Sequence, residues 1–188
     1  MTTHFTADTH FSHGGVIRMC ARPFASPEEM DALLIESWNA VVGPKDEVWH
    51  LGDFAMGASP ERCAEIFRRL RGRKRLVRGN HDRRRVLDLA WESQHDRAHV
   101  TVEGHRLVLD HYPMRAWSGS FRGAIHLHGH THGTLPGTSQ SCDVGVDSWA
   151  YRPVSLDDIL ARLAATPELP EERRRAAERD ADEGDDAE

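Results

Sequence analysis

The chain has 188 residues, of which 39% are hydrophobic and 29% are charged, which is ordinary for a globular protein. No apolar run approaches the roughly 20 residues that span a bilayer, and the first residues lack the basic and apolar regions of a signal peptide. The three cysteines, Cys20, Cys63 and Cys142, show no paired spacing and predict no disulfide framework. We therefore expect a reduced, cytoplasmic protein without a membrane partner.

The charge of the chain is concentrated at its end. Between Thr166 and Glu188 there are ten Asp and Glu residues and four Arg, a net charge of −6. The formal net charge of the whole chain is also −6, so the part before residue 166 is close to neutral. The end segment has almost no apolar residues. We therefore predict one compact domain over residues 1–165 and a charged, disordered tail over residues 166–188.

The first half of the chain alternates short β-prone runs with amphipathic helices. Strands are predicted over residues 4–7, 48–51 and 75–78. Helices are predicted over residues 26–43 and 59–72, because each begins with a Ser-Pro pair and ends at a glycine. The order of strand, helix, strand, helix and strand indicates a parallel sheet covered by helices.

The second half has a different pattern, with more strands and one helix. Residues 99–103 and 106–110 predict a hairpin, and residues 124–128 and 142–146 predict two more strands. Ser155 is expected to cap a last helix.

Polar side chains follow several of these strands, at the point where each strand ends. The carboxyl ends of strands in an α/β sheet meet at one edge, so we expect these side chains to converge there. Carboxylate, amide and imidazole groups are all metal ligands, and this mixture of oxygen and nitrogen does not single out one metal. The seven candidates are Asp8, His10, Asp53, Asn80, His111, His130 and His132.

Seven ligands are too many for one zinc ion but suit two ions that share a carboxylate. Two ions roughly 3.5–4 Å apart can clamp a phosphoryl group and activate the water that attacks it. The cofactors we expect are two divalent metal ions, manganese first, with iron, zinc, nickel and cobalt as the alternatives. The competing interpretation is that these side chains only pack or solvate loops. It would leave several polar groups buried at strand ends without partners.

The order of these groups along the chain resembles the motif order of the calcineurin-like metallophosphoesterase superfamily. The matching motifs are Asp8-Thr9-His10, Gly52-Asp53, Gly79-Asn80-His81-Asp82, His111 and Gly129-His130-Thr131-His132. Further stretches are similar to a small bacterial and phage subgroup of that superfamily. They are the run from Asp8 to His13, Arg22-Pro23-Phe24, the run from Val144 to Trp149, and Arg152-Pro153-Val154-Ser155.

This resemblance implies an α/β (α+β) fold, a four-layer αββα sandwich of two mixed β-sheets flanked by helices. It also implies which residues hold the two metal ions. They are Asp8, His10 and His132 for one ion, Asn80, His111 and His130 for the other, and Asp53 as the bridge.

The activity that the resemblance implies is hydrolysis of phosphate esters by a hydroxide that the binuclear centre activates, with phosphodiesters favoured. His81 would donate a proton to the leaving oxygen or stabilise its charge, and Asp82 would orient the His81 ring. The alternatives are a phosphomonoesterase or a nuclease with the same centre, and a non-catalytic scaffold that binds metal or nucleic acid. The expected partners are phosphate esters, nucleotides or nucleic acid among them, and the motifs leave the oligomeric state open.

Two residues beside the motifs, His13 and Arg22, are candidates for contact with the substrate phosphate. The competing interpretations are a loop residue for His13 and a surface salt bridge for Arg22. Three other histidines, His50, His126 and His128, lie within predicted strands. We expect those three to be packed or hydrogen-bonded rather than catalytic.

One segment is strongly basic, with ten basic residues and one acidic residue between Arg68 and Arg85. A track for a polyanion such as nucleic acid is one interpretation. The other is a solvated helix end followed by an arginine-rich loop. We favour the second because no aromatic side chains are interleaved there.

Overall fold

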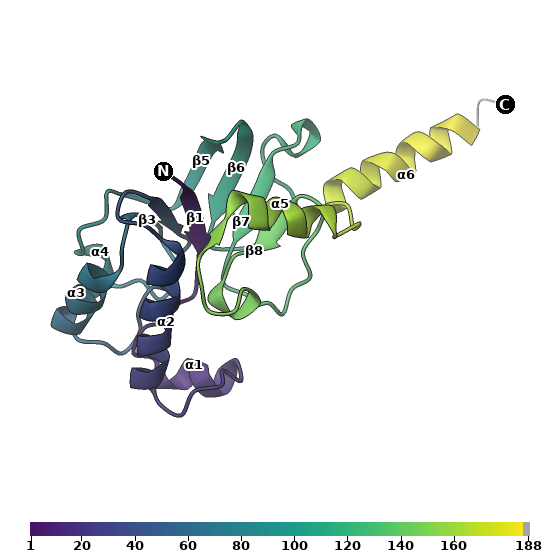
Figure 1. The fold of residues 1–188 in the computed structure, drawn as a ribbon. Helices are drawn as coiled ribbons and strands as arrows, with labels where there is room; N and C mark the ends of the chain where they lie inside the picture. Colours follow the sequence, from purple (N-terminus) through teal and green to yellow (C-terminus); the bar gives the residue numbers. More distant parts are fainter. Residues whose placement is uncertain (186–188) are drawn as a thin grey trace.

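The computed structural model describes the backbone of residues 1–185 and the side chains of residues 1–179, and two β-sheets form the centre of this part (Figure 1). The strands of the first sheet are β1 (Thr3–Thr6), β2 (Glu47–His50), β3 (Arg73–Val77), β4 (Ser93–His95) and β9 (Val154–Ser155). Their order is β4-β3-β2-β1-β9. β1, β2 and β3 are parallel, as the sequence predicts. β4, which was not predicted, is parallel to β3, and β9 is antiparallel to β1.

The strands of the second sheet are β5 (Arg97–Val102), β6 (His105–Asp110), β7 (Ile125–His128) and β8 (Ser141–Asp143), in that order. β5 and β6 form the predicted antiparallel hairpin, whereas β6, β7 and β8 are parallel. The hairpin turns at Glu103 and Gly104, with φ of 49° and 84°, as a two-residue turn between twisted strands requires.

Helices α2 (Pro27–Val41), α3 (Pro60–Arg69) and the short α4 (Arg84–Leu87) cover the outer face of the first sheet (Figure 1). Helix α1 (Gly14–Met19) lies beyond the end of β1. Helix α5 (Leu156–Ala164) packs against β1, β8 and β9. None of the helices in the described part of the chain is long and apolar enough to cross a membrane.

Helices α2, α3 and α5 begin where the sequence predicts, because their caps are local, whereas α1 and α4 were not predicted. The hydroxyl of Ser26 accepts a hydrogen bond from the N–H of Glu29 at 3.2 Å, and the carboxylate of Glu29 accepts from the N–H of Ala25. At α5, Ser155 and Asp158 form a complete capping box. Each device provides acceptors for N–H groups that a helix leaves unpaired at its start.

Two apolar layers hold the sandwich together. The first lies between the sheet and α2 and α3, and it includes Trp38 and Ile66. The second lies between the two sheets, where side chains such as Phe5, Leu109 and Leu127 point inward from alternate strand positions. The outer face of the second sheet is covered by residues 112–124, which contain the 3-10 helix η1 (Ser120–Arg122) and the buried Trp117. The predicted sandwich of two mixed sheets flanked by helices is confirmed.

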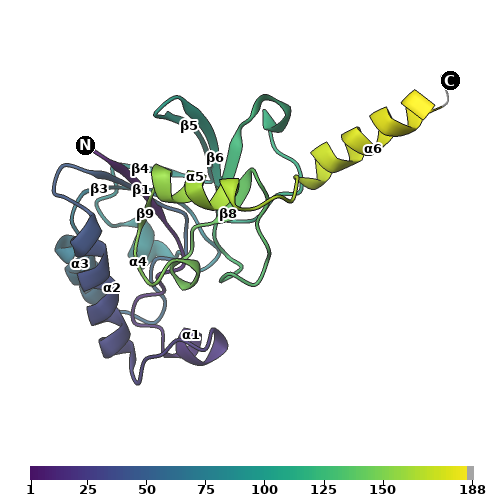
Figure 2. The same cartoon turned by 45° about the vertical axis from the view of Figure 1, so that its right-hand side comes forward.

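The end of the chain differs from the expected disordered tail. Helix α6 (Glu171–Asp185) projects away from both sheets (Figures 1 and 2). Glu, Arg and Ala fill this segment and are strong helix formers, and Arg175 pairs with Glu171 one turn away at 2.8 Å. The low hydropathy of this segment indicated that it would not pack into the core. It did not indicate that the segment would form a helix. Residues 186–188 of the tail lie outside the described residues, and a domain boundary after residue 165 stays a prediction.

Candidate metal centre

The predicted ligands lie where strands of both sheets end, on turns with an unusual backbone. Five of the seven have a positive φ, between 49° and 71°, although none is glycine. This left-handed conformation costs roughly 1–2 kcal/mol for a residue with a Cβ, and such strain concentrates at functional sites. The five are Asp8, His10, Asp53, His130 and His132.

Backbone hydrogen bonds tie these turns to one another. The N–H of Asp8 donates to the carbonyl of Gly52, and the N–H of His10 donates to the carbonyl of Asp53, both at 3.0 Å. The N–H of His130, from the second sheet, donates to Oδ2 of Asp8 at 2.8 Å. Three turns that are distant in sequence are thus held at one place.

Two groups of three potential ligand atoms, each within 4.8 Å of one another, share Asp8. The first group is Asp8, His10 and His132, and the second is Asp8, Asp53 and His111. Oδ2 of Asp53 lies between them, 3.6 Å from Nε2 of His10 and 3.5 Å from Nε2 of His111. Two neighbouring sets of donors are therefore present, with carboxylates between them.

The remaining predicted ligands, Asn80 and His130, adjoin the second group. Oδ1 of Asn80 lies 2.9 Å from Nε2 of His111 and 3.1 Å from Nδ1 of His130. Nδ1 of His111 donates to the carbonyl of Leu51 at 2.8 Å, which leaves Nε2 directed at the site. All seven predicted ligands are gathered at one place, although they come from five separate stretches of chain.

Several atoms at this place lack a partner, as expected where metal ions bind. Within the described part of the chain, Oδ1 of Asp8 and both ring nitrogens of His10 are buried without hydrogen bonds. Burial, together with the carboxylates of Asp143 and Asp53, raises the pKa of Asp8 well above its ordinary value. Burial, with His132 beside it, lowers the pKa of His10 to about 2, so this ring is neutral. Cations here would satisfy the unpaired atoms and offset the repulsion between carboxylates, so the residues fit divalent metal ions.

Two glycines of the motifs are required by the close approach of the chain to these carboxylates. A Cβ on Gly79 would lie 2.3 Å from Oδ1 of Asp53, and a Cβ on Gly129 would lie 2.6 Å from Oδ2 of Asp8. Both separations are far inside van der Waals contact. Only glycine therefore leaves room for the ligand carboxylates at these positions.

Arg22, a predicted phosphate contact, instead lies inside the molecule and supports one wall of the site. Its guanidinium donates two hydrogen bonds of 2.7 Å to the carboxylate of Asp147 and one of 2.7 Å to the carbonyl of Asp8. Only 3% of its surface is exposed, so both the phosphate contact and the surface salt bridge are wrong. Asp147 also accepts a hydrogen bond from Nδ1 of His132 at 2.7 Å, which leaves Nε2 of that ring for a metal.

Asp82, predicted to orient the ring of His81, holds backbone instead. Its Oδ2 accepts hydrogen bonds from the N–H groups of Asp53 and Gly79, and its Oδ1 accepts one from Phe54, each at 2.9 Å. Both oxygens are thus used to fix the turns that carry ligands. The resemblance implied His81 as the partner of Asp82. Buried N–H groups of a turn also need an acceptor, and only the fold identifies which one they find.

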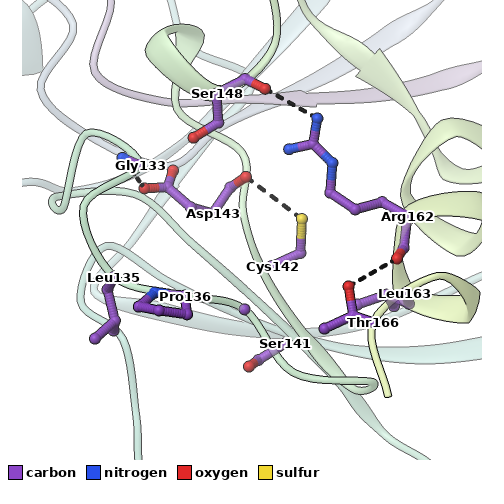
Figure 3. A pocket seen from close by; sticks show the side chains of 11 residues that line it. Gly133, Leu135, Pro136, Ser141, Cys142, Asp143, Ser148, Arg162, Leu163 and Thr166 are labelled. Carbon is purple, nitrogen blue, oxygen red and sulfur yellow. Dashed lines mark hydrogen bonds between the residues drawn. The ribbon is translucent and has the colours of Figure 1, made fainter. Parts of the chain in front are cut away.

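Asp143 was not predicted as part of the site, yet its carboxylate supports the loop that carries two histidine ligands. It accepts a hydrogen bond from the N–H of Gly133 at 2.9 Å (Figure 3). It accepts another from the hydroxyl of Thr131 at 2.8 Å. Its other oxygen accepts one from the N–H of Gly145 at 2.6 Å. Asp147 lies within the run from Val144 to Trp149, and Asp143 directly precedes it. This run resembles the bacterial and phage subgroup, and that resemblance is the signal that could have identified both residues.

His50 lies buried behind the first of these turns. Its Nε2 donates to the hydroxyl of Thr9 at 3.0 Å, and that hydroxyl donates to the carbonyl of Phe54 at 2.8 Å. These bonds join the turn after β1 to the turn after β2. His126 and His128 are also buried and hydrogen-bonded to backbone carbonyls, as expected from their place within a strand.

Two partly exposed histidines flank His10. The ring centroid of His81 lies 5.6 Å from that of His10, and the centroid of His13 lies 5.3 Å from it. The backbone N–H of His81 donates to Oδ1 of Asp53 at 2.8 Å, which fixes its position. His13 packs over Gly15, where a Cβ would lie 2.8 Å from its Nε2. Both imidazoles therefore stand beside the donor groups without belonging to them.

Comparison with known families and proteins agrees with these observations. The model of the calcineurin-like phosphoesterase superfamily domain matches residues 1–144, which contain all seven predicted ligands. The uncharacterized protein MJ1445 of Methanocaldococcus jannaschii is 34% identical over 169 residues, covering 84% of this chain and 88% of that protein. The gene 66 protein of Mycobacterium phage D29 is 31% identical over 187 residues, covering 82% of this chain and 92% of that protein.

One similar solved structure covers nearly the same part of the chain. Protein AQ665 of Aquifex aeolicus, described as a protein of unknown function, aligns with a TM-score of 0.68 and 25% identity. The alignment covers 84% of this chain and 97% of that one. The similarity therefore extends over both sheets rather than over one motif.

Proposed function

The chain belongs to the calcineurin-like phosphoesterase superfamily, and from this premise we propose that it is a phosphodiesterase that works with two divalent metal ions. The observation that carries the proposal is the pair of donor groups that share Asp8, together with Oδ2 of Asp53, which lies within 3.6 Å of a histidine of each group. A structural zinc ion, for comparison, takes about four ligands. Seven convergent donors therefore support two ions rather than one.

The proposed ligands keep the assignment that the sequence implies. When bound, two ions would neutralise the phosphate oxygens and lower the pKa of the attacking water. We propose manganese, with iron, zinc, nickel and cobalt as alternatives. Nitrogen and oxygen donors accept all five metals, so the measured metal content decides among them. The three cysteines are free, which supports the reduced, cytoplasmic setting that we predict. The ligands are Asp8, His10 and His132 for one ion, Asn80, His111 and His130 for the other, and Asp53 between them.

The chain itself would supply the acid and the placement of the substrate. We assign to His81 the proton that the leaving oxygen takes up as the phosphorus–oxygen bond breaks, because its ring stands beside His10. The hydrogen bond from its backbone to Asp53 would keep it next to the bridging carboxylate. His13, on another side of His10, is the proposed contact for the phosphate.

The proposed partners are phosphodiesters, with nucleotides and nucleic acid among them. A phosphomonoesterase or a nuclease with the same centre is the alternative among enzymes. A scaffold that binds metal or nucleic acid without turnover is the alternative among binding proteins. The presence of His81 beside the ligands favours an enzyme, because a scaffold has no need of a proton donor.

Hydrolysis of bis-p-nitrophenyl phosphate and p-nitrophenyl phosphate, with metal content measured on the same preparation, tests this proposal. We expect about two ions per chain, faster turnover of the diester, and loss of activity with a chelator. His81→Ala should keep its metal while kcat falls roughly 10²- to 10⁴-fold, because the general acid is gone. Protein that binds metal but hydrolyses neither ester would be a scaffold, and a His81→Ala variant with full activity would exclude His81 as the proton donor.

A further inference from the structure

Tyr112 is an exposed aromatic side chain at the edge of the candidate metal centre. It directly follows His111 in the chain, and 46% of its surface is exposed. The centroid of its ring lies 4.6 Å from that of His130 and 5.0 Å from that of His111. His111 and His130 are both proposed ligands of the second ion, so the phenol ring contacts that ligand set directly. Nδ1 of His130 also lies 3.1 Å from Oδ1 of Asn80, the third proposed ligand of the same ion.

The backbone on both sides of Tyr112 is fixed. The N–H of Tyr112 donates to Oδ1 of Asp110 at 2.9 Å, and Pro113 restricts φ at the next position. The N–H of Met114 then donates to Nε2 of the buried His126 at 3.1 Å. The ring is therefore held at the rim before any ligand arrives, and less conformational entropy is lost when a ligand packs on it.

The contacts of the ring leave much of it open. Its plane meets the plane of His130 at 60° and that of His111 at 75°, so the ring meets both imidazoles edge to face. The exposed part of the ring adjoins the metal centre through His111 and His130. A flat apolar group attached to the phosphate would find its complement on this ring.

We propose that Tyr112 stacks on an aromatic ring of the substrate, so that the site selects phosphate esters that carry a nucleobase or an aryl group. This inference rests on the proposed function, because it takes the phosphate to be bound at the metal centre. Stacking on a tyrosine ring is tolerant of base identity and strong enough to change affinity severalfold. Tyr112 thus becomes a specificity residue of the same site.

Two pairs of small phosphate esters measure how much the aromatic ring of the ligand contributes to the affinity. Adenosine 5′-monophosphate and ribose 5-phosphate differ by the base, and phenyl phosphate and methyl phosphate differ by the aryl group. Each is titrated calorimetrically into the manganese-loaded protein and into Tyr112→Leu and Tyr112→Phe variants. Phe121→Leu is the matched control, because Phe121 is 59% exposed on η1, outside the contacts of the metal site.

We expect the aromatic member of at least one pair to bind about tenfold more tightly to the wild type. The pair in which the aromatic member binds more tightly shows whether the ring that stacks on Tyr112 is a nucleobase or an aryl group. Tyr112→Leu should abolish this gain without changing the affinity for the non-aromatic partner or the metal content. Tyr112→Phe and Phe121→Leu should retain it.

Equal affinity within both pairs, or a gain that survives in Tyr112→Leu, would overturn the proposal. It would also be overturned if Tyr112→Leu lost metal or weakened both members of a pair alike, since Tyr112 would then only hold His130 in place. These titrations need no turnover. A protein that fails to hydrolyse bis-p-nitrophenyl phosphate but shows the Tyr112-dependent gain would contradict the proposed function alone.

Discussion

At the residue scale, the carboxylates of the site fall into two classes. Asp8 and Asp53 direct oxygens among the ligand histidines. Asp82 and Asp143 accept hydrogen bonds from turns, and Asp147 accepts them from a ligand histidine and an arginine. Replacing a member of the first class should remove a metal ligand. Replacing a member of the second class should loosen ligands that remain present.

Asp53→Asn should abolish binding of both metal ions, because the proposed bridge loses its charge. Metal content by mass spectrometry of the purified variant measures this directly. Asp96→Asn is the matched control, since Asp96 is exposed and pairs only with Arg78 at 2.7 Å in the described structure. If Asp53→Asn retained both ions and its full rate, Asp53 could not be the bridge.

Asp147→Asn should weaken metal binding by about 10- to 100-fold while leaving every ligand atom in place. The reason is that Asp147 fixes the ring of His132 through its Nδ1 and also neutralises the buried Arg22. Competition with a metal-sensitive dye would give the affinity. An unchanged affinity would mean that the ring of His132 is held by packing alone.

At the element scale, the segment before and at the start of α6 is attached to two loops of the second sheet. The N–H of Ser139 donates to the carbonyl of Glu168 at 2.7 Å, and the hydroxyl of Ser120 donates to Glu172 at 2.8 Å. Glu171 also pairs with Arg115. The chain end thus crosses the loops that cover the outer face of the sheet.

Removal of residues 167–188 should speed hydrogen exchange in residues 113–120 and 138–140 while shifting the melting temperature little. Exposed ion pairs contribute only about 0–1 kcal/mol each, so the loops loosen but the core persists. Removal of residues 177–188 is the control, because it keeps the contacts of Glu168 to Glu172. If both loops kept their full protection from hydrogen exchange after removal of residues 167–188, the chain end would not be what holds them.

Part of the charge of the arginine-rich segment from Arg68 to Arg85 is paired within the fold. Arg73 and Arg75 pair with Glu47 and Glu92, at distances between 2.8 and 3.7 Å. Two of the ten basic side chains are thus balanced by carboxylates on and beside the first sheet, and the solvated interpretation of the segment stays a prediction. Among the described side chains of the acidic chain end, Glu171 and Glu172 contact Arg115 and Ser120 beside the second sheet.

At the scale of the whole molecule, buried neutral histidines connect stability to pH. Burial lowers the pKa of His50 to about 3 and that of His126 to about 4. In the unfolded chain both would titrate near about 6.5. Between these folded and unfolded pKa values, the unfolded state therefore binds protons that the folded state does not bind. The contribution of these two neutral histidines to the free energy of unfolding is fully present above about pH 6.5. It is lost as the pH falls toward the pKa values of the folded state.

At pH 5 each of these histidines should cost about 2 kcal/mol of folding free energy. Urea unfolding at pH 7 and pH 5, with a chelator to exclude metal, measures the loss. His126→Gln should lose about 2 kcal/mol less than the wild type between the two pH values. His99→Gln, at an exposed position, should behave like the wild type. If His126→Gln lost as much folding free energy between pH 7 and pH 5 as the wild type, His126 would not be a source of the pH dependence.

The sequence by itself predicted most strands of the two sheets, the starts of α2, α3 and α5, and the seven candidate ligands that the fold gathers at one place. Its signals are local: a strand has a period of two, a helix start has its own cap, and a ligand follows the strand that delivers it. The site was therefore predictable as a set of residues. The left-handed turns at Asp8 and His10 that direct these residues were not.

Only the tertiary structure decided which polar group serves which partner. Arg22 and Asp147 are 125 positions apart, and neither residue type indicates that the pair is buried. Asp82 could face an imidazole or the N–H groups of a turn, and the packing of two loops decides between them. The exposure of Tyr112 is likewise a property of the folded surface. Local propensity acts over a few residues, whereas the burial of charge and the pairing of hydrogen-bonding groups depend on the segments that folding brings together.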